Sequence, residues 1–167
     1  MINKVQNLPQ LLLIVMTFGI GIALAIMPLP PAGEWFRPAW VLLILIYWLK
    51  TLPRSVGLLV AWGLGFWVDS IQGVVVGQYP LIFLIIALLV NMTRNVSHHF
   101  SRFQQILWMS VMVGIAQGMG MVIEKIVNGV SSPLWALSSG VASILAWPFV
   151  FALLRKCYRL GWGPRLG

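Results

Sequence analysis

The chain alternates between long apolar stretches and short segments that carry prolines and charges. Breaking the sequence at those segments leaves six apolar stretches, at residues 8–27, 38–52, 56–76, 80–92, 106–123 and 134–154. A helix rises about 1.5 Å per residue, and the hydrocarbon core of a bilayer is about 30 Å thick. The stretches therefore predict six membrane-spanning helices. The second and fourth are short and need snorkelling side chains or a locally thinner bilayer.

The composition favours the same class of protein. Of the 167 residues, 60% are hydrophobic and 8% are charged, which is more apolar surface than a soluble domain of this length can bury. The first stretch is longer than the apolar region of a signal peptide, so we interpret it as a retained anchor. We expect an all-α integral membrane protein in which residues 1–167 form a single domain, a compact bundle of six transmembrane helices.

The basic residues predict an orientation in the membrane. The net charge of +8 could suggest a nucleic-acid partner, but the bases lie at the ends of the apolar stretches, which is typical of membrane topology. With six crossings, nine bases fall on one side of the membrane: Lys4, Lys50, Arg54, Arg94, Arg102, Arg155, Lys156, Arg159 and Arg165. Only Arg37 and Lys125 fall on the other. We therefore expect a multi-pass inner-membrane protein with both termini in the cytoplasm and no nucleic-acid partner.

The sequence offers little catalytic chemistry. A membrane enzyme needs a nucleophile with a base, a metal cluster or paired carboxylates. Asp69 and Glu124 belong to different stretches, and the sequence alone does not pair them. His98 and His99 are adjacent, have no acid or cysteine nearby, and would not share a helix face. The single Cys157 cannot form an intramolecular disulfide. We predict no catalytic, metal or cofactor site.

Small residues recur every four positions through the third stretch. The positions are Gly57, Ala61, Gly65, Asp69, Gly73 and Gly77. In lipid, small side chains let helix backbones approach closely and gain dispersion contacts. The spacing therefore predicts that the third helix is the packing hub of the bundle and a surface for partners. Similar spacing occurs at Gly19-xxx-Ala23, Gly114-xxx-Gly118, Ala136-xxx-Gly140 and Ser139-xxx-Ser143.

Asp69 interrupts this ladder with a charge. An ionised carboxylate that faces lipid costs about 3 kcal/mol, so Asp69 should face protein or water. Two interpretations stay open. Either the negative charge itself has a function, or the carboxylate accepts hydrogen bonds from Ser70, Gln117 or a neighbouring helix end and holds the bundle together.

Three segments, taken in order and spacing, resemble a known family. They are FRPAWVLLILIYW at 36–48, GFWVDSIQGVVVGQ at 65–78 and WPFVFALLRKCYR at 147–159. Together they are similar to the rod shape-determining MreD family in its proteobacterial form, and the resemblance covers nearly the whole chain.

The resemblance implies a role and a set of partners. Members of this family are non-enzymatic inner-membrane components of the rod complex, which directs peptidoglycan elongation. They work with the single-span protein MreC, the actin-like MreB, and the polymerase RodA with its transpeptidase. The family has no catalytic residue to carry over. Arg37 and Pro38, and Asp69 with Gly73 and Gly77, match recurrent family motifs.

The family is also distantly similar in fold to the substrate-binding components of energy-coupling-factor transporters. This similarity implies an alternative function, the capture of a small ligand from the outer side of the membrane. Such a pocket needs converging polar groups, and the outer-facing ones are few. They are Glu34, Arg37, Asp69, Gln78, Glu124, Lys125 and Asn128. Because apolar packing surface is abundant, we favour a scaffold that binds the membrane span of a partner such as MreC.

Overall fold

The computed structural model describes residues 3–28, 37–52, 55–73, 76–97, 100–129 and 138–162. Six helices account for nearly all of them: α1 Asn3–Ile26, α2 Trp40–Thr51, α3 Leu58–Gln72, α4 Gln78–Ser97, α5 Arg102–Asn128 and α6 Ser138–Trp162. Each of the six predicted stretches coincides with one of these helices. The prediction of an all-α chain with six helices is therefore confirmed.

Several helix ends differ from the prediction. α4, α5 and α6 extend beyond the apolar stretches, whereas α3 ends at Gln72 instead of continuing to residue 76. Gly73 ends α3 by adopting a left-handed conformation with φ +62°, and its N–H donates to the Asp69 carbonyl at 3.0 Å. α5 begins in a charged segment because Ser101 and Gln104 form a capping box, in which each side chain bonds the other residue's backbone N–H.

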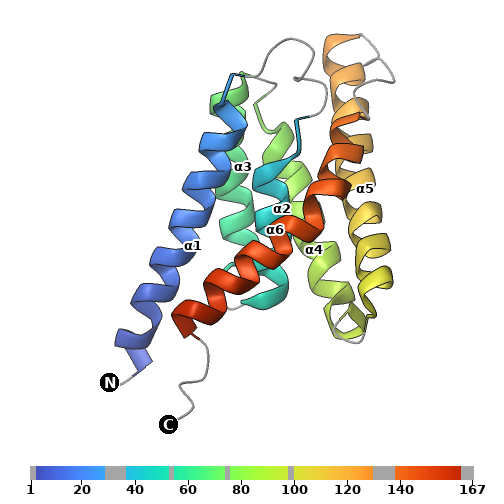
Figure 1. Ribbon diagram of the computed structural model, residues 1–167. Helices are drawn as coiled ribbons and strands as arrows, with labels where there is room; N and C mark the ends of the chain where they lie inside the picture. Colours follow the sequence, from blue (N-terminus) through green and yellow to red (C-terminus); the bar gives the residue numbers. More distant parts are fainter. Residues whose placement is uncertain are drawn as a thin grey trace.

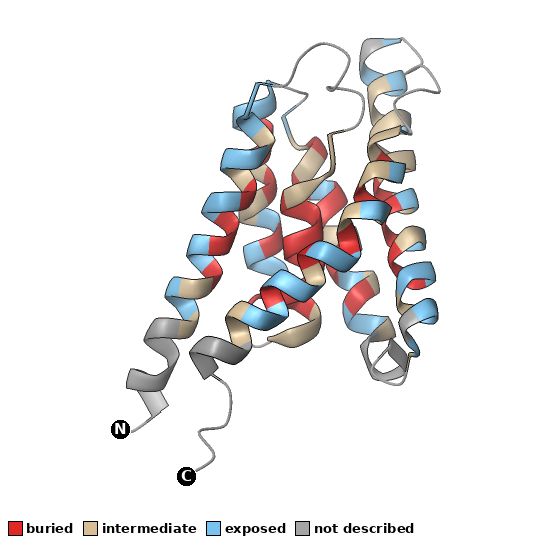
Figure 2. Cartoon of the chain, viewed as in Figure 1, coloured by how far each residue is buried: buried red, intermediate tan, exposed pale blue. Residues whose placement is uncertain are grey.

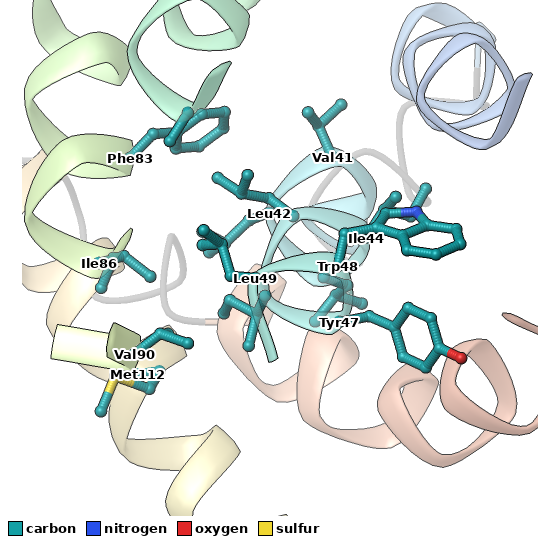
Figure 3. Packing of buried hydrophobic residues seen from close by; sticks show 14 of the residues in the cluster. Val41, Leu42, Ile44, Tyr47, Trp48, Leu49, Phe83, Ile86, Val90 and Met112 are labelled. Carbon is teal, nitrogen blue, oxygen red and sulfur yellow. The ribbon is translucent and has the colours of Figure 1, made fainter. Parts of the chain in front are cut away.

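The central helix of the bundle is α2. Every residue from Val41 to Leu49 is buried, and α1, α4 and α6 all contact this helix. Figure 3 shows Leu42 and Leu49 of α2 facing Phe83 and Ile86 of α4. A helix that is apolar all round is normally buried on all sides. The prediction that the third helix is the hub is therefore wrong, although α3 and α4 form the most extensive single helix pair.

Helices that are neighbours in sequence also pack together: α3 contacts α4, α4 contacts α5, and α5 contacts α6. The start of α1 and the end of α6 lie at the same end of the bundle (Figure 1). In Figure 2 the buried residues concentrate on α2 and on the inward faces of its neighbours, while exposed residues line the outward faces.

Two buried tryptophans form hydrogen bonds between helices. Trp48 Nε1 of α2 donates to Thr17 Oγ1 of α1 at 2.9 Å, and Trp108 Nε1 of α5 donates to Thr93 Oγ1 of α4 at 3.2 Å. Ser and Thr side chains commonly link helices in this way in apolar surroundings. The two contacts fix the register of α1 against α2 and of α4 against α5.

Two helical stretches in the described residues, Phe103–Val127 and Ser138–Tyr158, are long and apolar enough to cross a membrane. The other four apolar helical stretches have 10–17 residues: Gln10–Ile26, Trp40–Thr51, Leu58–Gln72 and Gln78–Thr93. α2, with 12 residues, extends only about 18 Å at 1.5 Å per residue. Because α1, α4 and α6 surround α2, most of its surface contacts protein. The shortest helix, α2, is thus the one that exposes the least surface to whatever surrounds the bundle.

Candidate functional site

The Asp69 carboxylate binds the start of the next helix. Asp69 lies in the last turn of α3 and is only 3% exposed. Its Oδ2 accepts a hydrogen bond from the Gly77 N–H at 2.5 Å, and its Oδ1 accepts one from the Tyr79 N–H at 2.9 Å. The first N–H groups of a helix have no partner within the helix, and the positive end of the helix dipole favours an anion there.

A sequence feature explains why this acceptor comes from another helix. A helix is usually capped by the side chain of the residue just before it, but that residue is Gly77, which has no side chain. Asp69 supplies the missing oxygen atoms. The hydrogen bonds to a neighbouring helix end that one of the two interpretations expects are therefore present, and whether the negative charge also has a function stays a prediction.

Gly73 and Gly77 serve the turn between α3 and α4. Both adopt positive φ angles, +62° and +98°, which side-chain-bearing residues rarely adopt. A Cβ added at either position would meet nothing within 4 Å. The expectation that these two glycines continue a packing ladder along the third helix is therefore wrong. Their small size is required by the backbone.

Gly65 is the ladder position that does allow close packing. A Cβ at Gly65 would collide with the backbone of Pro80 and would lie 2.7 Å from the carbonyl carbon of Tyr79. The α3 and α4 backbones therefore touch directly at this point. Ala61, one turn earlier, is fully buried. Gly57 precedes α3 in an extended conformation, and a Cβ there would meet nothing.

Arg37 binds the end of α1. Its Nη1 donates to the Ala25 carbonyl at 2.7 Å, and its Nη2 donates to the Met27 carbonyl at 2.7 Å. The last carbonyls of a helix lack partners and carry the negative end of the helix dipole, so a cation stabilises them. Arg37 therefore fixes the start of α2 to the end of α1.

Two serines bind the same segment to α6. Ser139 Oγ donates to the Arg37 carbonyl at 2.7 Å, and Ser143 Oγ accepts from the Ala39 N–H at 2.8 Å. Pro38 lies between these two anchored residues, where its carbonyl accepts from the Trp40 N–H at 2.8 Å. The predicted Arg37 and Pro38 positions thus form a junction of α1, α2 and α6. The Ser139-xxx-Ser143 spacing forms hydrogen bonds there.

A polar cavity of about 270 Å³ lies next to both features. It is bordered by the end of α1, the segment before α2, the first turn of α2, the end of α3, the start of α4, α5 and the start of α6. Its lining is apolar in part and includes these polar residues: Arg37, Gln72, Gln78, Tyr79, Gln117, Glu124 and Ser139. The cavity joins the two predicted motifs, since Arg37 and Pro38 line it and Asp69 holds Tyr79 at its edge.

The model of the rod shape-determining protein MreD family matches residues 6–157. The chain belongs to the MreD family. It is similar to the rod shape-determining protein MreD of Haemophilus influenzae (strain ATCC 51907 / DSM 11121 / KW20 / Rd), with 28% identity over 142 residues, covering 85% of this chain and 88% of the relative. No solved structure matches the chain, so the expected similarity to energy-coupling-factor components stays a prediction.

Membership of the MreD family implies a role in rod shape determination. Proteins of the MreD family are associated with the membrane and determine cell shape, and they are not known as enzymes. Among the described residues, no group of three or more His, Cys, Asp or Glu side chains could hold a metal ion. His98 and His99 lie outside the described residues.

The sequence indicates both charged residues of the cavity, Arg37 and Glu124, but not how the site is connected. No pattern singles out Tyr79, yet its N–H is half of the Asp69 contact. Gln117 was considered as a partner of Asp69, whereas its Nε2 donates to Ser139 Oγ at 3.3 Å. One signal was available: a helix that starts after a glycine lacks its own capping side chain, so an acid in the preceding segment becomes the expected acceptor.

Proposed function

We propose that the chain is a non-enzymatic, multi-pass scaffold of the bacterial inner membrane that binds the membrane span of an MreC-like partner by helix packing. Through this partner it would act in the rod complex with MreB, RodA and the transpeptidase of RodA. Membership of the MreD family supports the role in rod shape. The proposal about the partner rests on the surface of the helices.

The outward faces of the bundle support immersion in lipid. Large apolar side chains are among the most exposed in the described residues: Leu59 is 84% exposed, Ile126 77% and Leu145 73%. These residues belong to three different helices, α3, α5 and α6. A water-soluble protein rarely exposes apolar surface around its whole circumference. We therefore propose that all six helices lie in the membrane, with both termini in the cytoplasm.

A pair of small residues on α5 is the surface we propose for the partner. A Cβ added at Gly114 or Gly118 would meet nothing within 4 Å, so none of the helices in the described part of the chain uses that close-approach position. Ser110 extends the same four-residue spacing by one turn. A membrane helix of another protein could approach α5 here more closely than anywhere with bulky side chains.

Co-purification from mild detergent tests this proposal. Gly114→Leu and Gly118→Leu should each reduce recovery of the MreC-like partner at least fivefold without lowering the amount of the protein. Gly63→Leu in α3 is the matched control, because a Cβ there also meets nothing, but its neighbours at four residues, Leu59 and Trp67, are bulky. Equal recovery from all three variants would contradict docking on α5.

A further inference from the structure

Among the described residues, two that line the cavity beside Arg37 each carry a buried polar atom without a hydrogen-bond partner. Arg37 Nε and Gln78 Oε1 form no hydrogen bond although both atoms are inaccessible, and both residues line the cavity. Gln78 is 95% buried, since its exposed fraction is 5%. Buried polar groups in folded proteins are nearly always paired, so each exception calls for an explanation such as a bound group.

The two atoms have opposite hydrogen-bonding character. Arg37 Nε carries a proton and therefore needs an acceptor. The other two guanidinium nitrogens already donate to the Ala25 and Met27 carbonyls. Gln78 Oε1 is an acceptor and needs a donor. A single molecule that satisfies both must carry an acceptor and a donor. A simple anion offers only acceptors and a simple cation only donors.

The charge around the cavity also favours a neutral occupant. Its lining includes one base and one acid, Arg37 and Glu124, and its other polar residues are uncharged amides and hydroxyls. The volume of about 270 Å³ is slightly below the roughly 300–1,000 Å³ of pockets for drug-sized ligands. The occupant should therefore be small, without net charge, and able to both donate and accept hydrogen bonds.

We propose that this cavity is a binding site for a small, uncharged molecule that bears an amide, with the amide carbonyl accepting from Arg37 Nε and the amide N–H donating to Gln78 Oε1. An amide carries both functions, on an oxygen and a nitrogen that are joined through one carbon. The apolar part of the lining, including Val41, Ile82 and Phe83, surrounds the rest of the molecule. Binding at this cavity does not depend on whether a partner helix binds α5.

Saturation-transfer NMR on the detergent-solubilised full chain tests the site with two matched probes. N-acetylglycinamide can donate and accept, whereas N,N-dimethylacetamide can only accept. The wild-type protein should transfer saturation to N-acetylglycinamide at least fivefold more strongly than to N,N-dimethylacetamide. Absence of transfer to N-acetylglycinamide, or equal transfer to both probes, would overturn the proposal.

Two variants and two controls connect the signal to the cavity. Gln78→Leu removes the acceptor, and Gly120→Leu fills the cavity, since a Cβ at Gly120 lies 3.6 Å from Gln78 Nε2. Each should lower transfer to N-acetylglycinamide at least fivefold. Gln105→Leu and Gly63→Leu make the same exchanges outside the lining and should leave it unchanged. Wild-type transfer in both cavity variants would show that only water or nonspecific binding occurs there.

Gln78→Leu also has a readout that does not depend on any probe. If the buried oxygen is kept for a ligand, replacing it with an apolar side chain should leave the thermal unfolding midpoint of the unliganded protein unchanged or raised. N-acetylglycinamide at saturating concentration should raise the midpoint of the wild type alone. A lowered midpoint in Gln78→Leu would show that the oxygen supports the fold and would overturn its assignment to a ligand.

Discussion

The Asp69 Oδ2 atom lies 2.5 Å from the Gly77 backbone nitrogen, so a carboxylate at the end of α3 caps the start of α4. The same carboxylate accepts from the Tyr79 N–H at 2.9 Å. This contact makes α3 and α4 one structural unit and positions Gln78 and Tyr79 at the polar cavity.

Substitutions of Asp69 should separate hydrogen bonding from charge. Asp69→Asn keeps one acceptor but turns a donor toward the second amide, and should lower the free energy of unfolding by about 1–3 kcal/mol. Asp69→Leu leaves two buried N–H groups unpaired and should cost roughly twice as much. Unfolding in mixed micelles measures both, with the exposed Ser70→Ala as control.

The function of Asp69 in cells should follow this order of stability. A deletion strain that carries Asp69→Asn should keep rod shape and partner recovery better than one that carries Asp69→Leu. If Asp69→Asn abolished shape while the protein stayed abundant and still bound its partner, the negative charge itself would be functional, and ligand capture would replace the scaffold as the better account.

Gly65 and Gly63 offer a matched pair on α3. Gly65→Ala places a methyl group against the Pro80 backbone, and overpacking of this kind costs about 1–3 kcal/mol. Gly63→Ala meets no atom within 4 Å and should be neutral or stabilise the helix by up to about 1 kcal/mol. Thermal unfolding of the two purified variants distinguishes them, and similar midpoints would contradict the close contact of α3 with α4.

Gly73 should respond to backbone conformation and not to side-chain size. Because its φ is +62° and a Cβ meets nothing nearby, Gly73→Ala and Gly73→Leu should destabilise by a similar amount, about 1–2 kcal/mol. Gly73→Asn should be milder, since Asn tolerates the left-handed conformation. Denaturant titration checks this series. A much larger loss for Gly73→Leu than for Gly73→Ala would restore the packing role that the four-residue spacing predicts.

The six-span topology predicts which positions face each side of the membrane. On a Cys157→Ser background, single cysteines at Thr51 and Ser97 should react with a membrane-impermeant reagent only after the cells are opened. Cysteines at Gly33 and Ser131 should react in cells whose outer membrane alone is permeabilised. Labelling of Ser97 and Ser131 from the same side would contradict six crossings.

The number and approximate centres of the helices could be predicted because lipid-facing and core-facing residues are both apolar. The end of α3 could not be predicted, for the same reason. Three valines, Val74 to Val76, follow Gly73, so the apolar pattern continues past the end of α3. Only the positive φ angles of Gly73 and Gly77 show that the helix ends there. The central place of α2 was also hidden, because an apolar stretch looks the same whether protein or lipid surrounds it.

The chemistry of the site was predictable in its residues but not in its contacts. Asp69 stands out in the sequence as a charge within an apolar stretch, and Arg37 as a charge directly before one. Their partners are backbone groups, the Gly77 and Tyr79 N–H and the Ala25 and Met27 carbonyls, which every residue carries and no side-chain pattern can reveal. The unpartnered Gln78 oxygen depends on the packing of several helices, which no local spacing specifies.

The central claim, that this MreD-family chain holds a partner's membrane span on α5, is tested most directly by site-specific photocrosslinking in living cells. A photoreactive amino acid at position 114 should crosslink to the MreC-like single-span protein, and the same amino acid at position 63 on α3 should not. Crosslinking of that partner from position 63 and not from position 114, or from neither, would contradict the account.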